Sequence, residues 1–235
     1  MSLAEEPLRP FAEGVWLATE PVRHLGLQLT TTMTVLRLSD GRLLLHSPVA
    51  MTPERRAAIE RLGEVAHLYA PNLYHHLFVG EWAAAFPSAM LHAPAGLAQK
   101  RRDLRIDRIH GAAPVPALAD VLDEVRIDGF RLEECVLFYR PAQTLVVADL
   151  VHHIGRPTHR WTALYARAMG FYDRVALSRM LRWAAFSDRA AARRSVERML
   201  SLPFERLVVG HGSPLTRGAR EALAAACAWL PAAQP

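Results

Sequence analysis

Cysteine is scarce in this chain of 235 residues, which contains only Cys135 and Cys227, far apart in the sequence. A chain of this length buries enough apolar surface to fold without disulfides. Two isolated cysteines favour a reducing compartment, or simply serve as small buried hydrophobic residues. The composition therefore argues against the small, disulfide-rich class of secreted proteins.

Long apolar runs are also missing. The longest uncharged stretches are shorter than the ~18 apolar residues that a membrane-spanning helix needs. The N-terminal stretch MSLAEEPLRPFAEGVW is acidic and broken by prolines, and it lacks the basic start and apolar centre of a secretory signal. We therefore expect a cytoplasmic protein with no membrane partner.

Positive charge is in excess, with a formal net charge of +5, but the pattern of a nucleic-acid-binding surface is absent. Arginine is concentrated in stretches that are typical of helices, such as QKRRDLRIDR and RAAARRSVERML. Acidic residues are interspersed there, and aromatic residues are not interleaved. These stretches indicate solvated helix faces, and we expect a small-molecule substrate or ligand and no nucleic acid.

Two hairpins and several helices are predicted from the turn signals. Ser39-Asp40-Gly41 separates TMTVLRL from RLLLHSPV, and Arg140-Pro141-Ala142-Gln143 separates ECVLFY from TLVVADL. Thr52 precedes a helix that begins at Pro53 and is closed by Gly63. Strand clusters followed by helices occur twice, which predicts a four-layer αββα sandwich. We expect a single domain over residues 1–235, with a helical insertion at about 158–200.

Three predicted strands end in polar residues that are able to bind a metal. VAHLYAP leads into Asn72, Tyr74, His75 and His76; TLVVADL delivers Asp149; and RLVVGHG delivers His211. Strand ends converge at one edge of a sheet, so these three ends predict one shared site. Imidazole nitrogen and carboxylate oxygen are suitable ligands for zinc, iron or manganese.

The paired histidines are expected to point in different directions. In an extended segment adjacent side chains face opposite sides, so only one of His75 and His76 should point into the site. Both stay open as ligands from this argument alone. His211 lies between two glycines, which give its backbone freedom and leave space beside the ring.

The order of elements and the three strand ends resemble the metallo-β-lactamase superfamily. The stretches MTVLRLSDGRLLLHSPVAMTPE, APNLYHHLFVGEW, FPSAMLHAPAGLAQKRRDL and RPAQTLVVADL resemble an uncharacterised branch of it, a domain of unknown function. The resemblance implies the αββα fold and a metal site built from a His-x-His-x-Asp-His motif, a further His, an Asp and a late His. Asp149 stands at the place of the Asp and His211 at that of the late His.

The resemblance also shows departures from the family's pattern. Asn72 and Tyr74 fall at the first two histidines of the motif, His76 falls at its Asp, and Leu77 falls at its last His; this alignment favours His76 as the inward ring. The further His would fall near Phe130. Two metal ions would be poorly neutralised by the single matched aspartate, so we expect at most one divalent transition metal, zinc or iron. His76, Asp149 and His211 are the expected ligands; His75 could turn inward instead of His76, and Glu134 could supply a second carboxylate.

Three hypotheses for the function follow. In the first, the chain is a mononuclear metal-dependent hydrolase of a small ester, lactone, thioester or phosphoester; Asp149 positions the water or the metal, and Tyr74 or Asn72 donates to a developing oxyanion. In the second, it is a non-catalytic binding module whose old pocket is filled by Tyr74, Leu77 and Phe130. In the third, it is an iron oxidoreductase. The aromatic-rich segment 158–200 either covers the pocket, packs in the core or forms the face of a homodimer.

Overall fold

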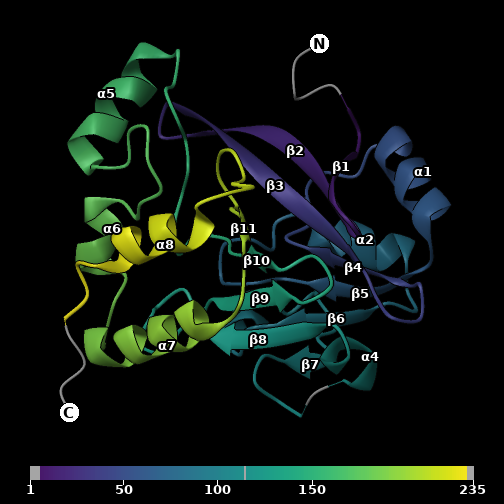
Figure 1. Cartoon of the computed structure of the whole chain (residues 1–235). Helices are drawn as coiled ribbons and strands as arrows, with labels where there is room; N and C mark the ends of the chain where they lie inside the picture. The colour runs from purple at the N-terminus through teal and green to yellow at the C-terminus, as the bar shows by residue number, and fades with distance from the viewer. Residues whose placement is uncertain (1–5, 114, 232–235) are drawn as a thin grey trace.

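Two β-sheets form the centre of the molecule (Figure 1). The computed structural model describes residues 6–113 and 115–231. The first sheet has seven strands in sequence order: β1 (Arg9–Ala12), β2 (Val15–His24), β3 (Leu27–Arg37), β4 (Leu43–His46), β5 (Val65–Tyr69), β6 (Met90–Ala93) and β7 (Arg108–Ile109). The second sheet has four strands in the order β11-β10-β9-β8: β8 (Leu122–Arg126), β9 (Cys135–Tyr139), β10 (Thr144–Val146) and β11 (Arg206–Val208).

The helices lie mainly on the outer faces of the two sheets (Figure 1). Those of the first half are α1 (Pro53–Leu62), α2 (Val79–Ala85), α3 (Leu97–Lys100) and α4 (Pro116–Ala119). Those of the second half are α5 (Arg160–Met169), α6 (Arg179–Ala184), α7 (Arg189–Ser201) and α8 (Ala219–Cys227). Among the described residues, we find no helix with the length and apolarity required to cross a membrane.

The alternation of side chains along each strand creates the layers. In β4 and β5, Leu45 and Leu68 pack with residues of α1 and α2, whereas Leu44 and Tyr69 face the second sheet. The second sheet alternates in the same way. In β9, Leu137 and Tyr139 belong to the cluster between the sheets, whereas Val136 and Phe138 belong to the cluster that contains residues of α7 and α8. Three stacked apolar interfaces therefore make an αββα sandwich, as the sequence predicts.

The turn and cap signals in the sequence predict the local structure correctly. The strands β3 and β4 form an antiparallel pair across Ser39-Asp40-Gly41, and β9 and β10 pair in the same manner. Thr52 caps α1, since its Oγ1 accepts a hydrogen bond from the N–H of Arg55 at 3.2 Å. Gly63 follows the last residue of α1.

The aromatic-rich segment from 158 to 200 contains three helices with different surroundings. Val196 and Met199 of α7 belong to the core beneath the second sheet. In contrast, α5 lies against the tip of the β2–β3 hairpin, where Thr162 Oγ1 accepts a hydrogen bond from the N–H of Gln28 at 2.9 Å. Trp183 of α6 is 79% exposed. One part of this segment thus completes the fold, and the other part projects from it (Figure 1).

Strand direction brings three loops to the same edge of the sandwich. In the first sheet β4, β5 and β6 run parallel, and in the second sheet β10 and β11 run parallel. Strand β3 contacts the turn that follows β11, where the N–H of Thr32 donates to the carbonyl of Gly210 at 2.9 Å. The segments that follow β5, β10 and β11 therefore meet beside β3.

Candidate metal site

The loop after β5 is shaped by Asn72, whose side chain is fully buried. Its Oδ1 accepts hydrogen bonds from the backbone N–H groups of Tyr74, at 2.9 Å, and His75, at 2.8 Å. An asparagine that binds the backbone two and three residues later folds the chain into a tight turn. The turn replaces the extended conformation that we expected here, and it directs His75 into the molecule.

The ring of His75 is held by Ser47, the residue directly after β4. A hydrogen bond of 2.6 Å joins Ser47 Oγ to His75 Nδ1. Ser47 has a φ of 53°, a left-handed conformation that is uncommon for residues other than glycine. Such strain persists only where the surrounding structure imposes it, and here it places a hydroxyl behind the His75 ring.

The loop after β10 is held by Glu134, which has no solvent exposure. Its carboxylate accepts hydrogen bonds from the backbone N–H of Ala148 at 2.9 Å and of Asp149 at 2.8 Å. The Asn72 amide donates both to Glu134, at 3.0 Å, and to Asp149 Oδ2, at 2.9 Å. Glu134 therefore positions the backbone of Asp149, and Asn72 orients its carboxylate.

The turn after β11 requires glycine on both sides of His211. A Cβ on Gly210 would lie 2.6 Å from the carbonyl oxygen of Ala148 and 2.9 Å from Cε1 of His75, so a side chain there would prevent the loops from meeting. Gly212 has a φ of +101°. Nδ1 of His211 donates to the carbonyl of Thr30 at 2.8 Å. Since the proton is on Nδ1, Nε2 of the neutral ring presents its lone pair to the site.

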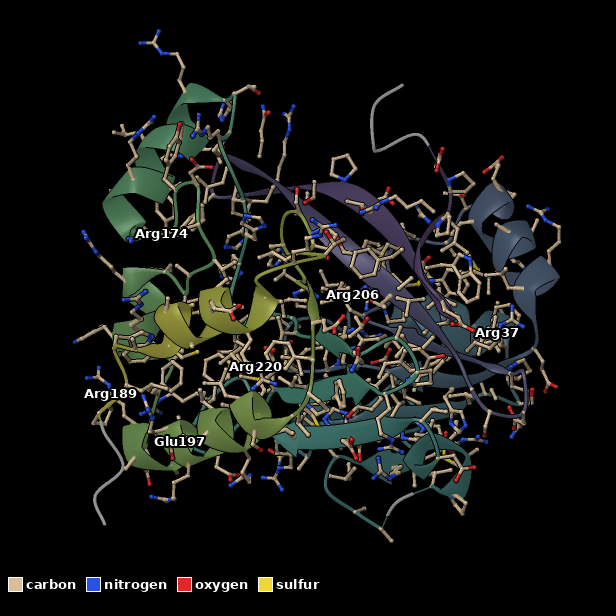
Figure 2. All side chains as sticks on the ribbon, viewed as in Figure 1. Arg37, Arg174, Arg189, Glu197, Arg206 and Arg220 are labelled. Carbon is tan, nitrogen blue, oxygen red and sulfur yellow. The ribbon has the colours of Figure 1, made fainter. Side chains whose placement is uncertain are left out.

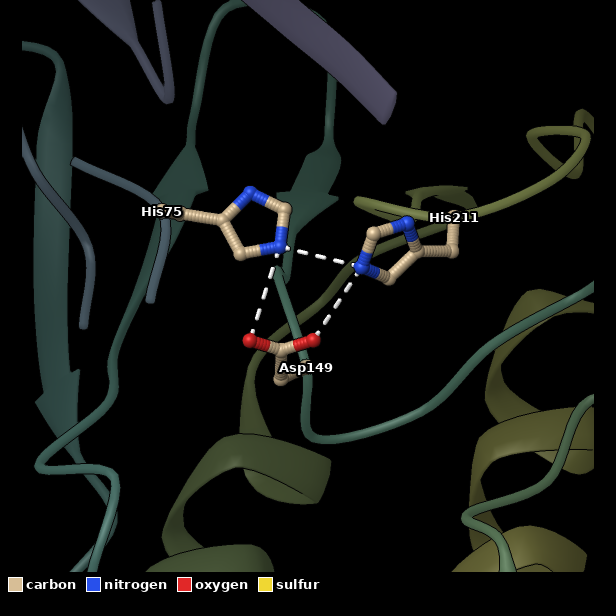
Figure 3. A group of neighbouring side chains, drawn as sticks. All are labelled: His75, Asp149 and His211. Carbon is tan, nitrogen blue, oxygen red and sulfur yellow. Dashed lines mark hydrogen bonds and ion pairs between the residues drawn. The ribbon is translucent and has the colours of Figure 1, made fainter. Parts of the chain in front are cut away.

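Three ligand atoms converge in this way from the ends of β5, β10 and β11 (Figure 3). His75 Nε2 and His211 Nε2 are 3.2 Å apart. Asp149 Oδ1 is 3.2 Å from His211 Nε2, and Asp149 Oδ2 is 3.5 Å from His75 Nε2. Ligands at ~2.0–2.2 Å from a tetrahedral metal are separated by about 3.3–3.6 Å. The distance between the two nitrogens is close to this value, and each nitrogen is at a similar distance from a different oxygen of Asp149. One ligand atom from each of the three residues lies within 4.8 Å of the other two.

The electrostatics of the site favour a cation. Burial alone would raise the pKa of Asp149, but the charges and hydrogen bonds of His75 and His211 hold that pKa well below its ordinary value. Burial acts to lower the pKa of His211, but the hydrogen bond and charge of Asp149 outweigh it and raise that pKa. Burial and the nearby charge of Asp149 raise the pKa of Glu134. The carboxylate and the two lone pairs repel one another unless a proton or a metal ion lies between them.

The other residues that the sequence singled out lie elsewhere. The ring of His76 is turned away, with Nδ1 3.3 Å from a guanidinium nitrogen of Arg101. Glu134 contacts backbone and amide donors instead of joining the three converging atoms. Tyr74 is 60% exposed and Leu77 is 69% exposed, so neither fills the pocket. Phe130 stacks on Phe186 in the core beneath the second sheet.

Two residues that orient the histidines were not identified from the sequence. Ser47 follows β4, and Thr30 lies near the start of β3. The only sequence signal for Ser47 is its position at the end of a strand adjacent to β5. Thr30 contacts His211 through its backbone carbonyl, and a pattern of side chains does not reveal such a contact. His152, in the loop after Asp149, is buried against the His211 ring at 5.3 Å between centroids.

Comparison with known proteins places this site on a recognised fold. Residues 13–97 match the family model described as "Domain of unknown function (DUF4336)". A search of curated proteins finds no match.

Several solved structures are similar over nearly the whole chain. A metallo-β-lactamase from Pontibacter korlensis has a TM-score of 0.66 at 13% identity, covering 95% of this chain and 97% of its own. A fragment described as a diflavin flavoprotein, from Nostoc, has a TM-score of 0.66 at 13% identity, covering 94% and 93%. The metallo-β-lactamase FIM-1 from Pseudomonas aeruginosa, in its mono-zinc form, has a TM-score of 0.60 at 13% identity, covering 94% of each chain. The chain therefore has the metallo-β-lactamase fold, and its first part matches a domain of unknown function.

Proposed function

We propose that this chain is a mononuclear metal-dependent hydrolase whose protein ligands are His75, Asp149 and His211. The observation that carries the proposal is the convergence of three side chains: the two histidine nitrogens are 3.2 Å apart, and each lies 3.2–3.5 Å from a different oxygen of Asp149. The far nitrogens of both rings are engaged, by Ser47 Oγ and by the carbonyl of Thr30. Metal-binding histidines are oriented by such outer hydrogen bonds.

The donor set is suited to one ion with open positions. Two histidines and one carboxylate leave room for substrate and solvent on zinc or on non-haem iron. Both N–H groups of the Asn72 amide are used by Glu134 and Asp149. A second cation bridging these carboxylates would have to displace that amide, which supports a single metal.

The proposed substrate is a small ester, lactone, thioester or phosphoester. A divalent metal in this site would act as a Lewis acid and polarise the substrate's carbonyl or phosphoryl oxygen. Asn72 has no N–H left for a substrate, so its role is to orient Asp149. Tyr74 is 60% exposed and its ring lies 5.0 Å from Lys100 Nζ, so we assign it no contact with the substrate.

Metal content is the direct test of the site. Protein purified without a histidine tag or added metal is analysed for zinc, iron and manganese. We expect close to one metal per chain, and its loss in His75→Ala and in His211→Ala. His76→Ala is the matched control, because it removes the adjacent ring and should retain the metal. Equal metal content in all four proteins would refute the ligand assignment.

An assay of substrate turnover distinguishes the hydrolase from the binding module. The metal-loaded protein is assayed with an aryl ester, an aliphatic lactone, a thioester and a phosphodiester, beside Asp149→Asn. We expect hydrolysis of one class, abolished in the variant and by a chelator. A metal-loaded protein that turns over none of them would contradict the hydrolase and favour the binding module. The second candidate, an iron oxidoreductase, rests on the two-histidine, one-carboxylate set, and iron as the dominant metal together with oxygen consumption would support it.

A further inference from the structure

A cavity in the second half of the chain is lined by none of the three residues His75, Asp149 and His211. Its volume is about 330 Å³, and it lies between the segment that precedes α6, helix α6 itself and helix α8. It is lined by His153, Arg174, Val175, Ala176, Arg182, Leu215, Ala222, Ala225 and Ala226. A cavity of this size holds a small organic molecule.

Positive charge at this cavity is not balanced by the protein. Between residues 160 and 187 the chain has five arginines and one acidic residue, Asp173. Asp173 lies outside the cavity lining and pairs with Arg156 at 2.6 Å. Among the described residues no carboxylate lines the cavity, and neither Arg174 nor Arg182 makes an ion pair.

The two guanidinium groups are held in place by main-chain acceptors. Arg174, on the segment between α5 and α6 (Figure 2), donates Nε–H to the carbonyl of Gly170 at 2.8 Å. Arg182 donates Nε–H to the carbonyl of Leu177 at 3.0 Å and lies 5.5 Å from the ring centre of Trp229. Both bonds use Nε, which leaves the paired terminal nitrogens for a ligand.

The proximity of these like charges is unfavourable in the absence of an anion. Burial and the charge of Arg174 lower the pKa of Arg182 from its ordinary value. A guanidinium fork binds carboxylate or phosphate oxygens in pairs, and such charge-assisted hydrogen bonds are stronger than neutral ones. Apart from His153, the rest of the lining is apolar, with Val175, Ala176, Leu215 and three alanines of α8.

We infer that this cavity binds a small organic anion, with Arg174 and Arg182 on its acidic group and its apolar body against α8. Carboxylates and phosphoryl anions share this chemistry. The inference is independent of the metal site, since it uses none of that site's residues.

Binding of anions to the purified protein tests the inference. Phenylphosphonate, benzoate and inorganic phosphate are titrated calorimetrically into the wild type. We expect phenylphosphonate or benzoate to bind more tightly than inorganic phosphate, because only they fill the apolar part. A higher affinity for phenylphosphonate than for benzoate would identify the preferred acidic group as phosphoryl, and a higher affinity for benzoate would identify it as carboxylate. Failure of all three to bind would overturn the inference.

Variants locate the anion. Arg174→Gln/Arg182→Gln should weaken binding by about tenfold or more. The control Arg102→Gln/Arg194→Gln makes the same change in net charge at two exposed residues and should keep the affinity. If Arg174→Gln/Arg182→Gln binds the anion as tightly as the wild type does, as expected for an anion bound at the metal site, the assignment of the anion to this cavity is refuted. Ala222→Leu, which preserves helix propensity and fills the cavity, should weaken phenylphosphonate more than inorganic phosphate; equal effects would contradict the proposed pose.

Discussion

Acid should destabilise this protein through a row of histidines buried between the sheets. His46 and His92 are the register partners of Tyr69 on the neighbouring strands β4 and β6. His110, directly after β7, stacks on the Tyr69 ring with 4.5 Å between the ring centres. Both ring nitrogens of His46 and of His110 lack a hydrogen-bond partner among the described residues. These rings are thus accommodated as neutral groups.

The direction of the effect follows from the pKa values. Burial, with smaller contributions from nearby positive groups, lowers the pKa of His46, His92 and His110 to about 3 each. The ordinary value, expected in the unfolded chain, is 6.5. Between about pH 3 and pH 6.5 the unfolded state binds more protons than the folded state does. The free energy of unfolding is therefore highest above about pH 6.5 and falls as the pH decreases toward about 3.

The magnitude is large compared with the stability of a typical domain. At pH 5.5 each of the three histidines costs about 1.4 kcal/mol relative to pH 7.5, hence about 4 kcal/mol together, against a typical total of ~5–15 kcal/mol. His67, hydrogen-bonded to His92 at 2.9 Å, has a pKa lowered to about 4 by burial and adds to the loss. The raised pKa of His211 acts in the opposite sense and offsets part of it.

Urea unfolding at pH 7.5, 6.5 and 5.5, followed by tryptophan fluorescence, measures the loss. His46→Leu should reduce the difference between pH 7.5 and 5.5 by about 1.4 kcal/mol, because one burial-shifted group is gone. At pH 7.5 the variant should keep most of its stability, since no hydrogen bond is broken. His24→Leu, at an exposed position on β2, is the control and should leave the difference unchanged. A wild type that loses less than ~1 kcal/mol, or a His46→Leu variant with the full loss, would refute the reasoning.

Two further predictions concern the groups that support the proposed metal site. Glu134→Gln should lower the free energy of unfolding, measured in urea, by about 1–3 kcal/mol, because an amide cannot accept from all three donors. Glu133→Gln, at the exposed neighbouring position, should change it far less. Similar losses in the two variants would contradict the role of Glu134. Ser47→Gly should relieve the strain of the left-handed backbone at residue 47 yet weaken metal binding by roughly 10–100-fold. Ser47→Ala should weaken metal binding as well, but without relief of the strain. A metal affinity equal to that of the wild type in both variants would show that the hydroxyl does not support His75.

The fold was predictable because its signals are local and periodic. The hairpin turns, the Thr52 cap and the alternating residues of β4 and β9 all act over a few residues, and each has a single structural meaning. The two-residue strand β7 has no such signal, since it is defined by its pairing with β6. The segment from 158 to 200 is helical as expected, but its interruptions depend on contacts with distant elements.

The convergence of Asp149 and His211 was predictable from the sequence, but the histidine that joins them was not. Asp149 and His211 lie on strand ends whose convergence follows from parallel pairing. The choice between His75 and His76 depends on whether the loop is extended or turned. The turn is made by Asn72 Oδ1, and a sequence alignment with a family motif does not contain this hydrogen bond. The motif alignment favoured His76, and the structure turns His75 inward.

Asn72 differs from the residue that the family motif has at this position, and its side chain determines the geometry of the site. The resemblance places Asn72 at a position where the family has a metal-binding histidine. Here its Oδ1 shapes the loop and its two N–H groups bind two carboxylates, which uses the whole side chain. A neutral amide between Glu134 and Asp149 reduces their repulsion without a second positive ion. The asparagine that stands where the resemblance implies a histidine therefore orients the carboxylate of Asp149, beside which His75 and His211 converge.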